Sequence, residues 1–140
     1  MQCLSMIAGQ LAWGDSPLLD KADFAMEAGE RVGLIGRNGT GKSSFMKVLA
    51  GQEMLDGGTL QRLEGQRAVY VEPEPAIPEA GTLLEAMIAR GSPAFAEDER
   101  AYWQESARLE EYFHKFSLRA EADPAKASGG EKKRAALALA

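Results

Sequence analysis

The chain has 140 residues, 45% hydrophobic and 26% charged, which is typical of one globular domain with a buried core. Its net charge of −5 predicts no broad polyanion-binding surface, so the sequence carries no signal for DNA binding. Its one cysteine, Cys3, excludes an internal disulfide, and no segment has the roughly 18 uninterrupted apolar residues of a membrane span. A reducing cytoplasm fits this composition best.

The first 26 residues read as short strands broken by a turn at residues 14–17. A second turn at residues 28–30 leads into residues 31–35, where the apolar run VGLIG (32–36) is suited to a buried parallel strand. Central neighbours for this strand are expected to lie beyond the chain, so residues 32–35 should lack partners and expose apolar edges.

Residues 36–43, GRNGTGKS, match the phosphate-binding pattern Gly-x4-Gly-Lys-Ser, and FMKVLA (45–50) follows with the apolar spacing of a helix. Glycines let successive N–H groups turn toward phosphate oxygens, and the positive end of a helix dipole adds to the same place. The alternative interpretation is a glycine-rich turn that serves packing alone. The strand, loop and helix together favour phosphate binding.

The side chains of this loop have separate expected roles. The Lys42 ammonium would reach the β- and γ-phosphates of ATP, the Ser43 hydroxyl would be a ligand of a nucleotide-bound Mg²⁺, and Ser44 would donate to the α-phosphate. The residues expected to hold the nucleotide here are Gly36, Arg37, Asn38, Gly39, Thr40, Gly41, Lys42, Ser43 and Ser44.

After the loop helix, Gly51 is placed to end the helix, and residues 56–58 predict a turn. Two further strand candidates follow, TLQRL (59–63) and RAVYV (67–71). Three prolines make residues 72–81 a connecting loop without regular structure. The chain therefore divides into an α/β part at 1–71, a loop at 72–81 and a helical part at 82–140.

The helical part opens on a capping box, Thr82 to Glu85, and its first helix is expected to end near Ala89, before residues 91–93. A longer helix is expected from about Ala96 to Phe116. One face of it carries Tyr102, Leu109, Phe113 and Phe116, its acidic residues form a solvated face, and the neighbouring Trp103 and Tyr112 are expected in the core.

A second motif, ASGGEKKR, spans residues 127–134. Ser128 and Glu131 have capping-box spacing and can simply start a helix through Ala140. The other interpretation adds Gly129 and Gly130, whose bare N–H groups at a helix N-terminus can receive an anion. Paired with the upstream loop at this spacing, the second interpretation is favoured.

With both motifs in place, the chain resembles the ATP-binding cassette (ABC) ATPases. GRNGTGKSS, PLLD (17–20) and SGGEKKRAALALA resemble the ABC-F branch, especially its Uup-type members, across nearly the whole chain. The resemblance implies a truncated P-loop NTPase fold of ABC type, with an antiparallel β subdomain and an α-helical subdomain. It also implies a soluble, two-cassette parent protein that acts on the ribosome, of which this chain is the first part of the N-terminal cassette.

The resemblance also assigns roles to residues. Ser128, Gly129, Gly130 and Glu131 would close on the γ-phosphate of an ATP held by a second cassette. Trp13 resembles the family's adenine-stacking aromatic, although a core tryptophan is an equal alternative. Lys132, Lys133 and Arg134 are the only dense basic run; they could touch RNA, but such a run is more often a solvated helix face.

The chain departs from the family pattern in two places. Glu72 and Glu74 stand where the family usually places a Gln that touches Mg²⁺. Either could substitute as an oxygen ligand, but a carboxylate there would add negative charge near the γ-phosphate. The chain also ends before the strand expected to carry the catalytic Glu, and His114 lies too early to be the switch His. We therefore expect ATP hydrolysis in the parent but not in this segment alone. Two alternatives to an ABC-F ATPase remain: part of a transporter's nucleotide-binding subunit, and a nucleotide-binding module without turnover.

Overall fold

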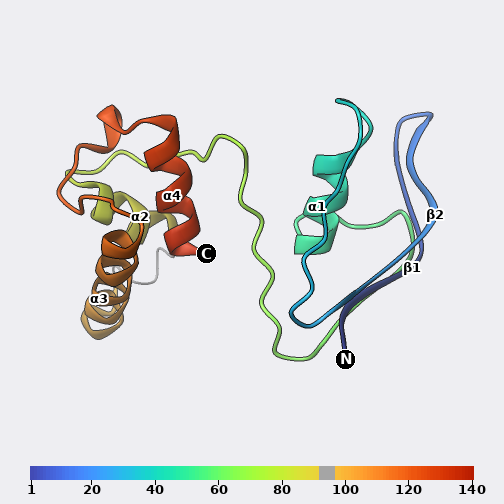
Figure 1. Cartoon of the computed structure of the whole chain (residues 1–140), viewed down its shortest axis with the longest axis horizontal. Helices are drawn as coiled ribbons and strands as arrows, with labels where there is room; N and C mark the ends of the chain where they lie inside the picture. The colour runs from blue at the N-terminus through green and yellow to red at the C-terminus, as the bar shows by residue number, and fades with distance from the viewer. Residues whose placement is uncertain (92–96) are drawn as a thin grey trace. The chain divides into compact units, whose positions relative to one another are not determined.

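The structure is a computed structural model that describes residues 1–91 and 97–140. The chain divides into two compact units, Met1–Tyr70 and Val71–Ala140, which are coloured blue to green and green to red in Figure 1. The predicted helix start at Ala96 and residues 92–93 of the break predicted at 91–93 fall outside the described residues, whereas Gly91 still belongs to the preceding helix, Leu83–Gly91. Each unit has its own hydrophobic core, so each is considered by itself.

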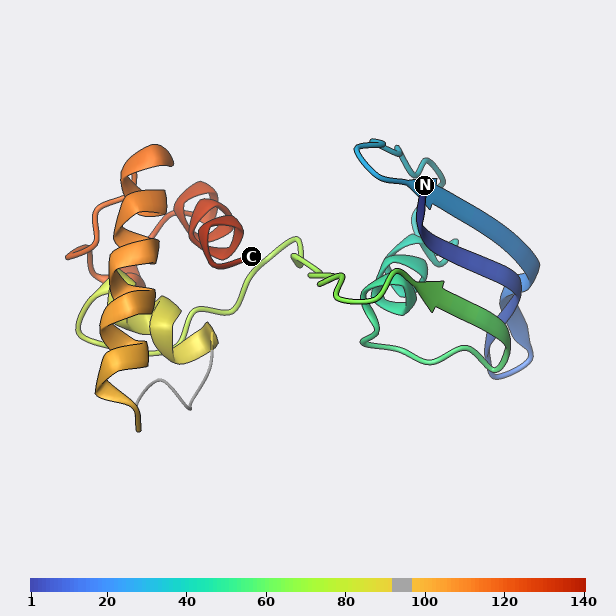
Figure 2. The ribbon, with the colours of Figure 1, turned by 90° about the horizontal axis from the view of Figure 1, so that it is seen from below.

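The first unit contains an antiparallel sheet with the order β2-β1-β3 (Figure 2). The strands are β1 (Gln2–Trp13), β2 (Ser16–Glu27) and β3 (Gly57–Arg62). The predicted hairpin is confirmed, although both of its strands are long, and Gly14 has a φ of 59° at the turn. The turn predicted at residues 56–58 is wrong in extent, because Gly57 and Gly58 already belong to β3.

Helix α1 (Lys42–Ala50) packs on one face of this sheet, as its apolar spacing predicts. Met6, Leu11 and Val48 form the buried centre of the contact, and Phe24 meets Phe45 edge to face at a centroid distance of 5.4 Å. Gly51 ends the helix in the left-handed conformation, with φ 82°, which confirms its predicted role.

Two of the predicted strands are absent from the first unit. Residues 31–36 and 67–71 have no strand structure, and Val32, Leu34 and Ile35 are 50%, 44% and 97% exposed. A strand exists only through ladder hydrogen bonds to a neighbour, and no strand of the described chain runs beside either segment. The strand assignments are therefore wrong for this chain, whereas the predicted apolar exposure at 32–35 is confirmed.

The second unit is helical, with α2 (Leu83–Gly91), α3 (Glu99–Lys115), a 3₁₀ turn (Pro124–Lys126) and α4 (Gly129–Leu139). The capping box at α2 is confirmed: Thr82 N donates to Glu85 Oε2 at 3.1 Å, and Glu85 N donates to Thr82 Oγ1 at 3.2 Å. Residues 72–81 have no helix or strand, as the prolines predict.

The core of the second unit includes Leu83, Met87, Leu109 and Phe113, each at most 1% exposed. Tyr102 and Phe116 pack at its edge, so the predicted apolar face of α3 is confirmed. The core assignment of Trp103 is wrong, because its side chain is 63% exposed and meets only the edge of Tyr102 among the aromatic rings described. Tyr112 is 37% exposed, so it too lies outside the core.

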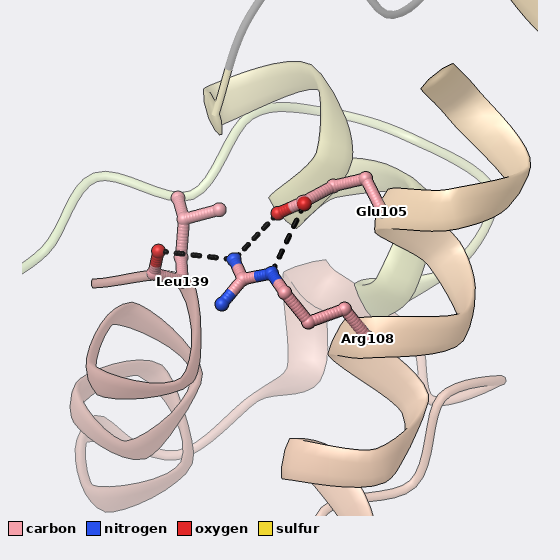
Figure 3. Close-up of polar contacts among 3 residues, drawn as sticks. All are labelled: Glu105, Arg108 and Leu139. Carbon is pink, nitrogen blue, oxygen red and sulfur yellow. Dashed lines mark hydrogen bonds and ion pairs between the residues drawn. The ribbon is translucent and has the colours of Figure 1, made fainter. Parts of the chain in front are cut away.

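Arginines tie α3 to α4. Figure 3 shows Arg108 of α3, which donates to both oxygens of Glu105, at 3.0 and 2.6 Å, and to the carbonyl of Leu139 at 3.4 Å. Hydrogen bonding to Glu105 raises the pKa of the Arg108 guanidinium. In the opposite direction, Arg134 of α4 donates to the carbonyl of Phe116, the C-cap of α3, at 3.2 Å. Each helix thus receives a cation at its carboxyl end.

Candidate functional site

The glycine-containing loop before α1 has the backbone that its sequence predicts at two positions. Gly39 and Gly41 have φ of 82° and 92°, a region that residues with a side chain rarely adopt. Gly36 has no positive φ; its requirement is for space, because a Cβ there would lie 2.9 Å from Thr40 Oγ1. A Cβ on Gly41 would also approach Leu18 Cδ2 to 3.0 Å. The loop is therefore folded tightly on itself and against β2.

Side chains of the loop bond to its own carbonyls. The Thr40 hydroxyl donates to the carbonyl of Arg37 at 2.7 Å, and the Lys42 ammonium donates to the carbonyls of Gly36 and Arg37. These contacts fold the Lys42 side chain over the loop and place its positive charge at the loop's centre. An ammonium carries three donors, so it can also bind an anion there.

The amino end of α1 is left without a side-chain cap. Its N-cap is Gly41, and no acidic residue lies in the first turn. The first N–H groups of a helix have no partner within the helix, so those of Lys42, Ser43 and Ser44 remain available. At the other end, Arg62 of β3 donates to the carbonyl of Leu49 at 2.6 Å, which places a cation at the negative end of the helix dipole.

A cavity of about 490 Å³ lies beside this loop. It is lined by Asn38, Gly39, Gly41, Lys42, Ser43 and Ser44 from the loop and helix, and by Trp13, Ser16 and Leu18 from the hairpin. Trp13 is 63% exposed at the end of β1, so the interpretation of Trp13 as a core residue is wrong for this chain. The structure thus brings Trp13 to the same cavity as six of the nine expected loop residues, whereas Gly36, Arg37 and Thr40 are not among the lining residues.

The donor set of this cavity fits a triphosphate with Mg²⁺. Positive φ angles and the contacts that a Cβ would make show a backbone folded closely enough to need glycine. The uncapped amides and the Lys42 ammonium supply hydrogen-bond donors for phosphate oxygens, and the Ser43 hydroxyl supplies one oxygen ligand for the metal. Over the described residues, no group of three or more His, Cys, Asp or Glu could hold a metal by itself. A magnesium here would depend on nucleotide oxygens for its other ligands.

In the second unit, Ser128 caps α4. Its Oγ accepts from the backbone N of Glu131 at 3.2 Å and donates to Glu131 Oε1 at 2.9 Å. The interpretation as a helix start is therefore confirmed. A Cβ on Gly129 or Gly130 would meet nothing within 4 Å, and neither residue has a positive φ. Nothing in the described chain accounts for glycine at these two positions, and their predicted contact with an anion stays a prediction.

The basic run that ends this motif, residues 132–134, is not one uniform surface. Lys133 is exposed, whereas Arg134 is half-buried and donates to the carbonyls of Gly130 and Phe116. Arg134 therefore has a structural role within the helical unit. Contact of this run with RNA stays a prediction, carried by Lys132 and Lys133.

The connecting loop is fastened by an ion pair. Glu72 Oε1 lies 2.5 Å from Arg90 Nη2, and Arg90 also donates to the carbonyl of Ala76. Hydrogen bonding from Arg90 lowers the pKa of the Glu72 carboxyl. Glu72 is thus occupied within the helical unit, which argues against it as a metal ligand, whereas Glu74 remains exposed.

The model of the family described as ABC transporter matches residues 19–140. The chain belongs to the ABC ATPase family. It is 34% identical over 113 residues to the ATP-binding protein Uup of Haemophilus influenzae, covering 81% of this chain and 17% of the relative. It is 40% identical over 132 residues to Uup of Caulobacter vibrioides, covering 94% of this chain and 20% of the relative.

A solved structure, described as the ATP binding subunit of an ABC transporter, superposes with a TM-score of 0.75 at 26% identity, covering 99% of this chain and 61% of that one. The predicted Uup-type ABC ATPase and its partial P-loop NTPase fold are confirmed by these matches. The chain spans about a fifth of the length of the Uup relatives. Members of the family hydrolyse ATP. Among the described helices, none is long and apolar enough to cross a membrane.

Sequence reasoning did not single out several residues that shape the site. Ser16 and Leu18 line the cavity, and Arg62 caps α1 from a strand 13 residues away in sequence. Asp56 accepts a hydrogen bond from the backbone N of Ala12 at 2.8 Å, next to Trp13. These contacts join residues far apart in the chain, so no local pattern signals them.

Proposed function

We propose that this chain binds Mg·ATP in the cavity between Trp13 and the phosphate loop, with the adenine against the Trp13 ring. The observation that carries the proposal is the convergence, on one cavity, of an exposed aromatic ring with the glycine-folded loop and the uncapped end of α1. An aromatic face stacks on a base, while amides and an ammonium hold phosphate oxygens. The two parts of the nucleotide thus have complementary surfaces.

Lys42 provides the direct test. The variant Lys42→Ala removes a charge-assisted hydrogen bond, for which we expect a loss of about 1.5 to 3 kcal/mol in ATP binding. This corresponds to about a 10- to 150-fold rise in Kd, measured by calorimetry in the presence of Mg²⁺. The matched control is Lys47→Ala, which removes the same charge from the same helix. Lys47 does not line the cavity, and its Nζ lies 3.8 Å from Glu53 Oε1. Equal affinity of both variants for ATP would refute the assignment.

We propose that binding and hydrolysis are divided between this segment and the rest of a longer protein. None of the described residues lining the cavity is a carboxylate or an imidazole, so none of them is a general base for water. The segment would bind, orient and neutralise the phosphates, while Ser128, Gly129 and Gly130 would contact the nucleotide of a second cassette. We expect no phosphate release from this chain, and release from the full-length protein assayed beside it.

The similarity to Uup supports an ABC-F ATPase acting on the ribosome, in the cytoplasm, as the proposed context. The second candidate is the nucleotide-binding subunit of a transporter, which the similarity to the ATP binding subunit of an ABC transporter supports. Sedimentation of the full-length protein with ribosomes, with ATP and with the Lys42→Ala variant as control, distinguishes the two. Nucleotide-dependent association with ribosomes is expected for the first candidate, and its absence would favour the second.

A further inference from the structure

The end of strand β1 that carries Trp13 pairs with β2 on one side only. On the side of β2, Ala12 pairs with Pro17 and Trp13 pairs with Ser16, after a change of register between Leu11 and Ala12. On the other side, β3 pairs with β1 only as far as Gln10, opposite Gly57. On the side of β3, the sheet therefore gives no ladder pair to Leu11, Ala12 or Trp13.

Asp56 supplies a hydrogen bond at this place. Its carboxylate Oδ2 accepts from the backbone N of Ala12 at 2.8 Å, and its own backbone N donates to the carbonyl of Gln10 at 2.7 Å. The two bonds continue the β1 and β3 ladder beyond the point where β3 begins. A side chain distant by 44 residues in sequence thus fixes the residue next to Trp13.

The base from which Asp56 reaches β1 is rigid. Gly58, two residues later, has φ 86°, and a Cβ there would lie 2.3 Å from the carbonyl oxygen of Ala8. A Cβ on Gly57 would lie 2.9 Å from Gln10 Oε1. The start of β3 is therefore packed directly against β1, which fixes the position of the neighbouring Asp56 backbone.

We infer that Asp56 is a positioning residue that holds the Trp13 ring at the nucleotide cavity and so determines affinity for the base, but not for the phosphates. The inference rests on the proposed function of this cavity. Trp13 is mostly exposed, and therefore its orientation depends on the backbone that carries it. Restricting a ring before binding lowers the entropy lost when a base stacks on it.

The test compares ATP with inorganic triphosphate, both as magnesium complexes, by calorimetry on the 140-residue chain. In Asp56→Ala, we expect the Kd for ATP to rise about three- to tenfold, the effect of one hydrogen bond, while the Kd for triphosphate changes less than about twofold. Asp56→Asn keeps an oxygen acceptor and is expected to restore the ATP affinity. Equal losses for ATP and triphosphate, or an unchanged ATP affinity, would overturn the inference.

Asp23 of β2 provides a matched control, because its carboxylate bonds to the same strand, β1. Its Oδ1 accepts from the backbone N of Ala8 at 2.7 Å, an equally short carboxylate to amide bond, but it does not line the cavity that contains Trp13. In Asp23→Ala, any general loosening of β1 is expected to change both affinities by the same factor. A selective loss of ATP affinity in this control would count against a specific role for Asp56.

A ligand-free measurement separates this inference from the proposed function. In a Trp103→Phe background, Trp13 is the only tryptophan, and its time-resolved fluorescence anisotropy reports the freedom of the ring. We expect a larger fast-decaying amplitude in Asp56→Ala than in Asp56→Asn, and identical decays would refute the positioning role. If neither ATP nor triphosphate binds the unchanged chain, the proposed function fails, whereas the anisotropy result still decides whether Asp56 fixes Trp13.

Discussion

The two glycine-rich turns of this chain, the loop at residues 36–41 and the first helical turn of α4 at residues 129–130, contain glycine for different reasons. In the first, Gly39 and Gly41 have positive φ, and a Cβ on Gly36 or Gly41 would contact neighbouring atoms at about 3 Å. In the second, a Cβ on Gly129 or Gly130 meets nothing, and the φ angles are ordinary. The first turn needs glycine in order to fold. The second turn has glycine without a reason inside the described chain.

The N-termini of the two helices at these glycines, α1 and α4, also differ. Helix α1 begins without a side-chain cap, whereas α4 begins with Ser128, whose Oγ caps Glu131. A capped start is stable by itself, but an uncapped start leaves N–H groups for a ligand. Close approach by the proposed second cassette would account for glycine at 129 and 130.

Replacing Gly41 by Ala should have the largest effect. The change combines an unfavourable φ of 92° with a Cβ placed 3.0 Å from Leu18, for which we expect a loss of about 2 to 3 kcal/mol in the free energy of unfolding. Urea unfolding followed by Trp13 fluorescence, with Trp103→Phe as background, measures the first unit. The control is Gly39→Ala, which has a similar φ of 82° but no contact within 4 Å, so it should lose less. Equal stability of Gly41→Ala and the unchanged chain would break the comparison.

Replacing Ser128 by Ala should have an intermediate effect on the other unit. It removes the side-chain cap of α4, which typically costs about 1 kcal/mol. The readout is urea unfolding followed by Trp103 fluorescence in a Trp13→Phe background. Ser128→Asp keeps an acceptor for the Glu131 amide and should retain most of the stability. No change in Ser128→Ala would mean that the cap does not stabilise α4.

Features that depend on residues close in sequence could be predicted, whereas features that depend on distant residues could not. The loop at 36–43 and both capping boxes follow from local sequence, because a φ angle or an i to i+3 hydrogen bond involves residues a few positions apart. The hairpin and the core face of α3 follow from periodicity for the same reason. The strands expected at 31–35 and 67–71 did not form, because a strand depends on neighbours that periodicity does not supply.

Contacts between distant segments were the other unpredictable part. The Asp56 bond to Ala12 and the Arg62 bond to Leu49 join residues that only the fold brings together. Trp103 is an aromatic residue beside the predicted core face, but it lies one position past the buried face of α3 and is exposed. Likewise, Arg134 belongs to a basic run in sequence, yet half-burial and two carbonyl acceptors give it a structural role.

Replacing Gly130 by Ala should have the smallest effect and the opposite sign. Alanine is a better helix former, and the added Cβ meets nothing, so we expect a gain of up to about 1 kcal/mol in the stability of the second unit. The same Trp103 measurement applies, with Gly129→Ala as the neighbouring comparison. A loss of stability would show that the fold itself requires glycine here. A gain combined with slower phosphate release from the full-length protein would support close approach by a second cassette.

The paired arginines of the helical unit imply that the far ends of two helices open together. Arg108 bonds to the last turn of α4, and Arg134 bonds to the C-cap residue of α3, so fraying of either end removes an acceptor from the other helix. Amide hydrogen exchange should therefore be correlated between the carboxyl ends of α3 and α4. Because Arg134 also bonds to the carbonyl of Gly130, a disturbance at the end of α3 would reach the turn at residues 129–130 through a single side chain.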